Sequence, residues 1–316
     1  MDKVLNTGRK KMIGIKDLSE MFDHPEKDLS GFFVTQFNNI DTIFREANLK
    51  EFSEYCMDVL KLINSSVITR TKEENLKVWN KGWEENLNAL LACSDLSEVL
   101  RPKYFRGAKY LRYKKGLIVS KNPMLEHDLF TLVRDIIFRK YLSKCENIYE
   151  FGCGSCQNLL MLSNIFPDKR LYGMDWAPSS VKIVEALAKK RKLKIHGAVF
   201  DMMNPSRGIA LRPKSAVLTV HALEQLGEDH GNLLSYLLTA RPDIVVHYEP
   251  ILEFYDQNNL LDYLAILYSK KRNYLSGFWT ALCELERKGK IEIIRAKRPF
   301  LGGVIHEASL IVWRPV

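Results

Sequence analysis

Long apolar runs are missing from this sequence of 316 residues. Its apolar segments, such as residues 244–246, are far shorter than the roughly 20 residues that a membrane-spanning helix needs. The first eleven residues contain basic side chains but no apolar core followed by small residues. The sequence therefore predicts neither a membrane span nor a secretory signal.

Cysteine is also scarce, with six residues scattered along the chain. That number in a chain of this size does not indicate a disulfide framework, so we expect a protein of the reducing cytoplasm. Cys153 and Cys156 form a C-x-x-C pair, but no second pair and no histidine at ligand spacing lie nearby. We interpret the pair as packing around a turn, and we expect no metal.

Acidic residues are fewer than basic ones, 38 against 47, which gives a net charge of +9. Such an excess permits a nucleic-acid partner. However, the basic residues form short clusters such as 189–192 and 270–272 on helical patterns, without a basic tail or an aromatic-basic stripe. We interpret them as solvated helix faces, with an anionic partner or a membrane surface as the alternative. Nothing in the sequence decides between a monomer and a homodimer.

The first 144 residues contain no glycine-turn chemistry and are predicted to be mostly helical. Apolar spacing of three and four predicts helices over 29–38, 40–68, 75–91 and 125–141. Asp41 and the pair Asn122-Pro123 are candidate helix starts. The aromatic-basic segment 102–113 has no clear periodicity, and it either lines a pocket or packs as a loop.

From residue 145 onward, short apolar runs alternate with helical stretches. This pattern predicts an α/β fold, in which crossover helices connect the strands of a parallel sheet. The predicted strands are 147–151, 170–174, 195–200, 215–220, 243–248, 290–296 and 307–313, and the predicted helices are 157–165, 179–191, 222–238 and 257–288. Only a short connection with Pro299, Gly302 and Gly303 separates the last two strands, so they should form an antiparallel hairpin. We expect two regions, 1–144 and 145–316.

The run from Ile148 to Ser155 is the most informative stretch of the sequence. An apolar strand ends at Glu150, breaks into the turn Gly152-Cys153-Gly154, and leads into a helix. Such a turn brings bare backbone N–H groups close to a ligand. Asp175 closes the next strand, where an acid can accept hydrogen bonds from a ribose diol. Together these features predict a nucleoside-binding site.

Polar residues also follow the later strands. The third strand leads into Asp201-Met202, the fourth into 221–225 and the fifth into 247–253. Because ligands of open α/β sheets lie beyond the carboxyl ends of the strands, we expect these residues at one cleft. Structural alternatives stay open, since Asp175 can cap a helix, Asp201 can serve a turn and Trp176 can be a core aromatic. The third glycine of a dinucleotide motif would fall at Gln157, which argues against NAD.

This series resembles the class I S-adenosylmethionine-dependent methyltransferases over residues 145–316, with a looser likeness to bacterial small-molecule members. The resemblance implies a seven-stranded Rossmann-like sheet and S-adenosylmethionine as the cofactor. It also implies that the cofactor is bound by Glu150, Gly152, Gly154, Asp175, Trp176, Asp201, Met202 and His221. In this assignment Asp175 holds the ribose, Trp176 flanks the adenine, and His221 lies near the methionine part. Cys156 stands where many members carry a third glycine.

The catalytic candidates lie at the fourth and fifth strand ends: His221, Glu224, His247 and Glu249. Glu224 follows His221 by three residues, which places both on one helical face. Pro250 favours extended geometry at Glu249, so we expect that carboxylate to point into the pocket. Glu253, His306 and Glu307 are more distant candidates. The same histidines and glutamates have donors for a divalent ion, but the sequence does not fix their geometry.

Several glutamates at two strand ends of a basic protein suggest a cationic or hydroxyl-rich small substrate. We therefore predict a methyltransferase that acts on an amine or guanidine nitrogen, or on a sugar-type hydroxyl, of a small polar metabolite. An RNA methyltransferase that uses the basic surface, or a non-catalytic partner module, is the alternative. The N-terminal half is predicted to form a lid, with Tyr104, Arg106, Tyr110 and Arg112 facing the ligands.

Overall fold

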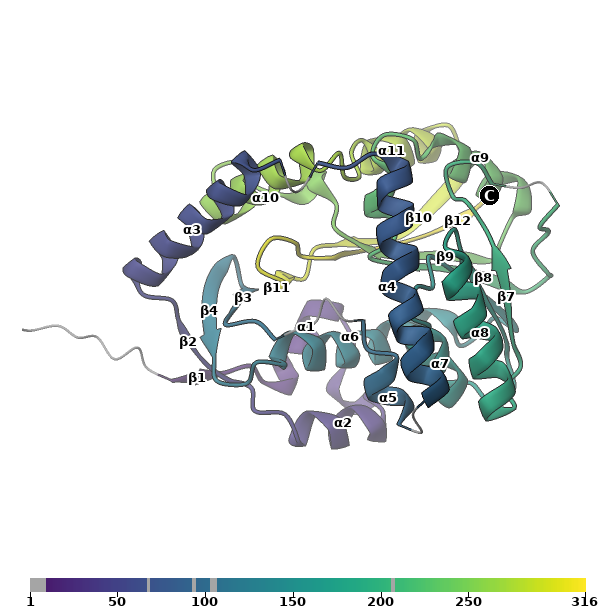
Figure 1. Ribbon diagram of the computed structural model, residues 1–316, viewed down its shortest axis with the longest axis horizontal. Coiled ribbons are helices and arrows are strands. Elements are labelled where there is room, and N and C mark those ends of the chain that lie inside the picture. Colours follow the sequence, from purple (N-terminus) through teal and green to yellow (C-terminus); the bar gives the residue numbers. More distant parts are fainter. Residues whose placement is uncertain (1–9, 67–68, 93–94, 103–106, 206–207) are drawn as a thin grey trace, which may run out of the picture.

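The computed structural model describes residues 10–66, 69–92, 95–102, 107–205 and 208–316. Its larger sheet has seven strands in the order β10-β12-β9-β8-β5-β6-β7 (Figure 1). These strands are β5 (Asn147–Phe151), β6 (Arg170–Asp175), β7 (Ile195–Val199), β8 (Ser215–Val220), β9 (Ile244–Glu249), β10 (Ile291–Lys297) and β12 (Ser309–Pro315). Each of the seven strands predicted from the apolar runs is present, with ends displaced by at most two residues.

Strand β12 is the one that runs against its neighbours in this sheet. It pairs antiparallel with both β9 and β10, whereas the pairs among β5, β6, β7, β8 and β9 are parallel. The chain returns from β10 to β12 without a crossover helix, so the two strands must be antiparallel. This confirms the predicted seven-stranded Rossmann-like sheet with its C-terminal hairpin. The strand order reverses at β5, which places a crevice beyond the carboxyl ends of β5 and β8.

Two of the four helices predicted after the strands, 157–165 and 179–191, are present with ends displaced by at most one residue, and the other two are divided. The predicted helix 222–238 is two elements because Gly227 has a φ of +58° and breaks it. The predicted helix 257–288 is likewise divided, since Asn273 and Gly277 have φ angles of +52° and +73°. The observed elements are α7 (Gln157–Ile165), α8 (Pro178–Arg191), η2 (Leu223–Leu226), α9 (Gly231–Ala240), η3 (Leu252–Phe254), α10 (Leu260–Lys271) and α11 (Phe278–Arg287).

The N-terminal half contains helices, as expected, and also strands that the sequence did not reveal. The helices are α1 (Ile15–Phe22), η1 (Glu26–Asp28), α2 (Gly31–Asn38), α3 (Leu49–Asn64), α4 (Lys72–Ala92), α5 (Leu96–Val99) and α6 (Leu125–Leu142). The strands are β1 (Lys11–Met12), β2 (Ile43–Glu46), β3 (Tyr110–Tyr113) and β4 (Gly116–Ser120). They form an antiparallel sheet in the order β1-β2-β4-β3-β11, where β11 is Leu301–Gly302.

The predicted helix over 40–68 is therefore wrong at its start. Asp41 precedes strand β2, and the helix begins only at Leu49. Asn48 accepts a hydrogen bond from Glu51 N at 2.9 Å, and the Glu51 carboxylate accepts one from Asn48 N at 3.1 Å. This reciprocal cap fixes the helix start, and the cap was not predicted.

The two halves of the chain share one hydrophobic core. Leu18, Phe33 and Leu90 from the N-terminal helices belong to the same buried cluster as Ile148 and Leu218 from the large sheet. The connection between β10 and β12 also leaves the large sheet, and its strand β11 pairs with β3 (Figure 1). The boundary at residue 144 remains a prediction. Within the described ranges, no helix combines the length and apolar character needed to cross a membrane.

Candidate functional site

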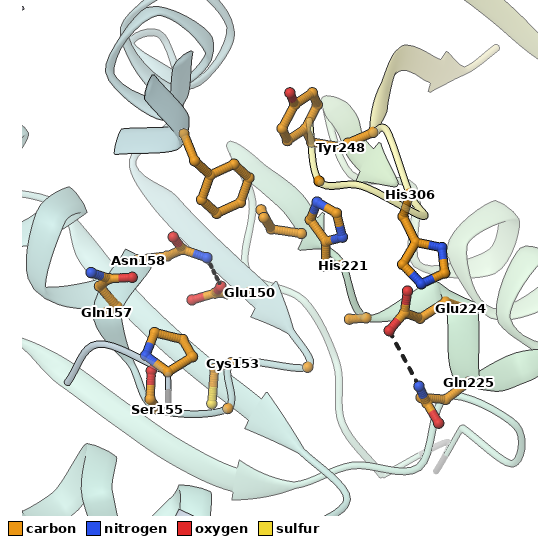
Figure 2. Close-up of a pocket in the computed structure, with 18 of the residues that line it drawn as sticks. Glu150, Cys153, Ser155, Gln157, Asn158, His221, Glu224, Gln225, Tyr248 and His306 are labelled. Atoms are coloured by element: carbon orange, nitrogen blue, oxygen red, sulfur yellow. Dashed lines mark hydrogen bonds between the residues drawn. The ribbon is translucent and has the colours of Figure 1, made fainter. Parts of the chain in front are cut away.

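A cavity of about 370 Å³ lies beyond the carboxyl ends of the central strands. Nine residues predicted for the site line it: Glu150, Gly152, Gly154, Asp175, Trp176, Asp201, Met202, His221 and Glu224. The N-terminal half contributes side chains from α4 and α6, and the β10–β12 connection contributes residues 301–306. Figure 2 shows the residues after β5 on one side of this cavity and those of η2 and the connection on the other.

The glycine turn after β5 is held against the neighbouring strand and against the segment after β8. Gly152 N and Cys153 N donate to Met174 O at 2.7 and 3.1 Å. Gly152 has a φ of +75°, and a Cβ at this position would lie 2.3 Å from the Cβ of Ala222. Both the conformation and the close approach therefore require glycine. Cys156 has a φ of +65°, which explains why a third glycine would suit its place.

Asp175 faces the cavity and also stabilises the glycine turn. Its two carboxylate oxygens accept hydrogen bonds from Gly154 N and Ala177 N, each at 2.8 Å. Burial raises the pKa of Asp175 to about 6, although these backbone hydrogen bonds oppose the rise. Each carboxylate oxygen has a second lone pair, so the group can still accept from a diol.

Helix α4 covers the turn and the neighbouring rim. Trp79 and Trp83 stack at a centroid distance of 5.4 Å, and both line the cavity. A Cβ on Gly154 would meet the Trp83 ring at 2.8 Å. At the start of α4, Lys72 Nζ lies 3.0 Å from the Asp201 carboxylate, which also accepts from Met203 N at 2.9 Å. Asp201 therefore stabilises a turn, which was the structural alternative to a binding role, and it also lines the cavity.

A chain of hydrogen bonds leads from Glu150 to helix α6. The Glu150 carboxylate accepts from Asn158 Nδ2 at 2.5 Å, and Asn158 Oδ1 accepts from Arg134 Nη1 at 2.6 Å. Glu150 Oε2 is buried and has no hydrogen bond from any described residue. Burial raises the pKa of Glu150 to about 8, against the effects of Asn158 and Arg134. Sequence reasoning missed Arg134, although an arginine next to Val133 on a mostly apolar helix was a signal.

The opposite side of the cavity holds His221, Glu224 and His306. His221 has a φ of +51°, and its ring packs edge-on against Phe130 at 5.4 Å. Burial and the nearby Arg134 lower the pKa of His221 to about 4, whereas burial raises that of Glu224 to about 7. His306, which was predicted only as a distant candidate, also lines the cavity. Figure 2 shows these three side chains on one side of the site.

Two predicted catalytic residues do not line the cavity. His247 is buried with Nδ1 2.8 Å from Thr219 Oγ1, and its ring packs against Phe278 and Trp313. Both oxygens of Glu249 accept from Ala222 N at 3.0 Å. Side chains alternate along a strand, so His247 and Glu249 share a face of β9. Tyr248, between them, lines the cavity instead.

The remaining candidates have other partners. Arg112 is fully buried and forms ion pairs with Asp262 and Glu307, and Tyr110 packs edge-on against Tyr55. Leu111, the residue between them, lines the cavity. Glu253 is exposed and accepts from Trp279 N at 3.0 Å. Tyr104 and Arg106 lie outside the described residues.

Metal donors do not converge in the part of the chain that the structure describes. No group of three or more histidine, cysteine, aspartate or glutamate side chains there is arranged to hold a metal ion. Cys153 and Cys156 are both buried free thiols. A hydrogen bond with Cys156, together with burial, raises the pKa of Cys153 well above its ordinary value.

The buried glutamates give a testable pH dependence of stability. The pKa values of Glu150, Glu224 and Glu249 are about 8, 7 and 8, above the ordinary 4.5, so the folded protein binds protons that the unfolded chain releases. The free energy of unfolding should therefore fall between pH 6.5 and 8, by at most about 1.4 kcal/mol per group and pH unit. The buried histidines have lowered pKa values, so they change the free energy of unfolding with pH only below about pH 6.5.

Urea denaturation at pH 6.5 and 8.0 measures this effect in the wild type and in Glu249→Gln. Glutamine keeps an oxygen for Ala222 N but cannot ionise, so the variant should lose less stability than the wild type over this range. An identical loss in both proteins would contradict the assignment to Glu249.

No protein-family model matches the chain, and no curated protein sequence matches it. Among solved structures, the mitomycin 7-O-methyltransferase MmcR is 15% identical, with a TM-score of 0.43 over 60% of this chain. The methyltransferase domain of bacterial CtHen1 is 16% identical, with a TM-score of 0.45 over 59% of this chain and 98% of its own. The O-methyltransferase NcsB1 from neocarzinostatin biosynthesis is 13% identical, with a TM-score of 0.40 over 61% of this chain. The chain covers 57% of MmcR and 58% of NcsB1.

Proposed function

We propose that this protein is an S-adenosylmethionine-dependent methyltransferase that acts on a small molecule. The observation that carries the proposal is the meeting of three acids from neighbouring strand ends, Glu150, Asp175 and Asp201, at one cavity beside the glycine turn. Asp175 would accept the ribose hydroxyls, with Trp176 and Met202 beside the adenine. Asp201 would lie at the adenine amine.

The charge of this rim favours a cationic cofactor over a phosphorylated one. Glu150 and Asp175 are buried next to the turn that holds a pyrophosphate in dinucleotide-binding proteins. The sulfonium and ammonium groups of S-adenosylmethionine would favour the ionised form of these buried carboxylates, whereas phosphate oxygens would be repelled by it. Glu150 Oε2, which has no hydrogen bond from a described residue, would accept from the ammonium, and Arg134 lines the same cavity for the carboxylate.

Bound S-adenosylmethionine supplies an electrophilic methyl group. The residues of the chain would align the acceptor, exclude water and remove a proton where the acceptor is a hydroxyl. Helix α4 and the β10–β12 connection border the cavity, which suits the exclusion of water. His221 and Glu224 line it as candidate proton acceptors, for a hydroxyl or an amine of a small metabolite.

Calorimetric titration of the full chain with S-adenosylmethionine and S-adenosylhomocysteine tests the proposal. We expect one saturable site for each and no measurable binding of NAD, which serves as the control nucleotide. A panel of amines, guanidino compounds and sugars is then screened for transfer of a labelled methyl group. Failure to bind either adenosyl compound, or preferential binding of NAD, would refute the proposal.

A further inference from the structure

The cavity wall remote from the glycine turn is mostly apolar. Its apolar residues come from β3, α6 and the β10–β12 connection, and they include Leu111, Leu129, Val133, Leu301, Val304 and Ile305. The polar groups in this half are Glu126 beside Gly303, His221, Gln225, and Glu224 and His306, which face one another (Figure 2). A wall of this kind suits a ligand with an apolar body and one polar group. It does not suit a sugar, whose hydroxyls would lose water without finding partners.

His306 is held in place by aromatic side chains on its other side. Its ring lies 5.3 Å from that of Tyr268 and 5.7 Å from that of Tyr274. Burial, together with the negative charge of Glu224, raises the pKa of both tyrosines. Nδ1 of His306 is buried and has no hydrogen bond from a described residue. Figure 2 shows the imidazole turned toward Glu224, and both residues line the cavity.

The residue after His306 is fixed by a buried ionic cluster of Arg112, Asp262, Arg298 and Glu307. Arg298 donates to Glu307 from Nε at 2.8 Å and from Nη2 at 2.6 Å, and to Asp262 from Nη1 at 2.6 Å. Arg112 Nε lies 3.1 Å from Glu307 Oε1 and also pairs with Asp262. The Tyr255 hydroxyl accepts from Glu307 N at 2.9 Å and donates to Glu307 O at 3.0 Å.

Burying four charges adds little net stability compared with apolar residues of the same volume, but it fixes geometry. The cluster joins β3, α10 and both ends of the β10–β12 connection. It therefore holds the backbone at residue 307, and with it the position of His306. Such support is what a catalytic group needs if it is carried by a loop.

We propose that the methyl acceptor is a hydroxyl group on a small apolar ring system, that His306 takes its proton, and that Glu307 is a positioning residue for His306. This inference rests on the function proposed above. As the acceptor oxygen forms its bond to the methyl carbon, the carbon–sulfur bond breaks and its electron pair stays on sulfur. The hydroxyl proton moves to the imidazole of His306, and the facing Glu224 carboxylate offsets the charge that forms.

The state of these groups at neutral pH agrees with this role. Burial lowers the pKa of His306 to about 3, so the imidazole is neutral at pH 7 and needs the negative charge of the facing Glu224 to hold a proton. Burial raises the pKa of Glu224 to about 7, although Arg272 and Gln225 oppose the rise. An imidazolium formed beside Glu224 would favour the ionised carboxylate.

The test uses 5-hydroxyindole and 5-aminoindole, which differ only in the acceptor group, with glucose as a polar control. Calorimetry first measures S-adenosylhomocysteine binding, and then the binding of each probe to that complex. Transfer of a labelled methyl group is measured next for the wild type, His306→Gln, His306→Ala and Glu307→Gln. His196→Gln is the matched control, because His196 is exposed on β7 and outside the cavity.

We expect both indoles to bind, glucose not to bind, and the oxygen of 5-hydroxyindole to be methylated. The His306 variants should lower kcat about 100-fold, with less than about threefold change in the affinity for S-adenosylhomocysteine and 5-hydroxyindole. Glu307→Gln should lower kcat and leave KM unchanged, and His196→Gln should match the wild type.

Three results would overturn the inference while leaving the proposed function intact. They are an S-adenosylhomocysteine complex that binds neither indole, methylation of 5-aminoindole but not of 5-hydroxyindole, and His306 variants with wild-type kcat. Failure of the wild type to bind S-adenosylhomocysteine at all would instead refute the proposed function.

Discussion

Gly152→Ala should abolish cofactor binding and destabilise the fold. The alanine would need a φ of +75°, which costs about 1–2 kcal/mol outside glycine. Its Cβ would also meet the Ala222 Cβ at 2.3 Å, so the turn or the segment after β8 must move. Overpacking of this kind costs a further amount of about 1–3 kcal/mol. Urea denaturation should show the sum, and calorimetry should show at least about a 100-fold loss of S-adenosylhomocysteine affinity.

Gly289→Ala is the matched control for this prediction. Gly289 also has a positive φ, +64°, but no atom lies within 4 Å of the position its Cβ would take. Gly289→Ala should lose only the stability that the unfavourable backbone conformation costs, about 1 kcal/mol. It should keep full affinity for S-adenosylhomocysteine. If both variants lose the same stability and Gly152→Ala still binds the cofactor, the close contact with Ala222 is irrelevant to the site.

Asp175→Ala should weaken cofactor binding by about 10- to 100-fold, or about 1–3 kcal/mol. The carboxylate has two tasks, because it is the proposed ribose acceptor and it also holds Gly154 N and Ala177 N. Removing it leaves two backbone donors without their partner, so the turn itself should loosen. Calorimetry with S-adenosylhomocysteine measures the loss.

Asp175→Asn and Asp168→Ala separate these contributions. Asparagine keeps one oxygen for a backbone donor, so it should lose less stability than alanine while still losing affinity. Asp168 is exposed in the turn before β6, and its replacement should change neither quantity. An unchanged affinity of Asp175→Ala would remove this residue from the proposed site.

The C-terminal half of the fold could be predicted because its signals are local. The apolar runs between Asn147 and Pro315 are long enough for a buried strand but too short for a buried helix. Glycines or acids mark where the runs end. The missing crossover before β12 fixed the direction of that strand. Because parallel strands end at one edge, the acids at their ends had to meet.

The N-terminal sheet and strand β11 could not be predicted. These strands are two to five residues long, too short for a periodic pattern, and all pairs except the β3–β4 hairpin join strands far apart in sequence. The pairing of Leu301 with Tyr113 depends on where the whole hairpin connection lies. No local signal at either residue encodes it.

Two of the four catalytic candidates, His247 and Glu249, lie outside the cavity for a related reason. A strand end can be recognised in the sequence, but the face to which each of its side chains points is not fixed until the strand is packed. On β9, Tyr248 faces the cavity while His247 and Glu249 do not. On β3, Leu111 rather than Arg112 lines it. In both cases a shift of one residue decides between pocket and interior.

By itself, the sequence determined the seven-stranded sheet and the glycine turn with its acids, because these depend on residues close together in the chain. Only the tertiary structure decided the other half of the cavity, where helix α6, strand β3 and the β10–β12 connection converge. The β10–β12 connection lies far from the other two segments in sequence, and buried packing and the ionic cluster around Glu307 bring it to them. Long-range contacts of this kind leave no periodic trace, since each residue alone is compatible with many neighbours.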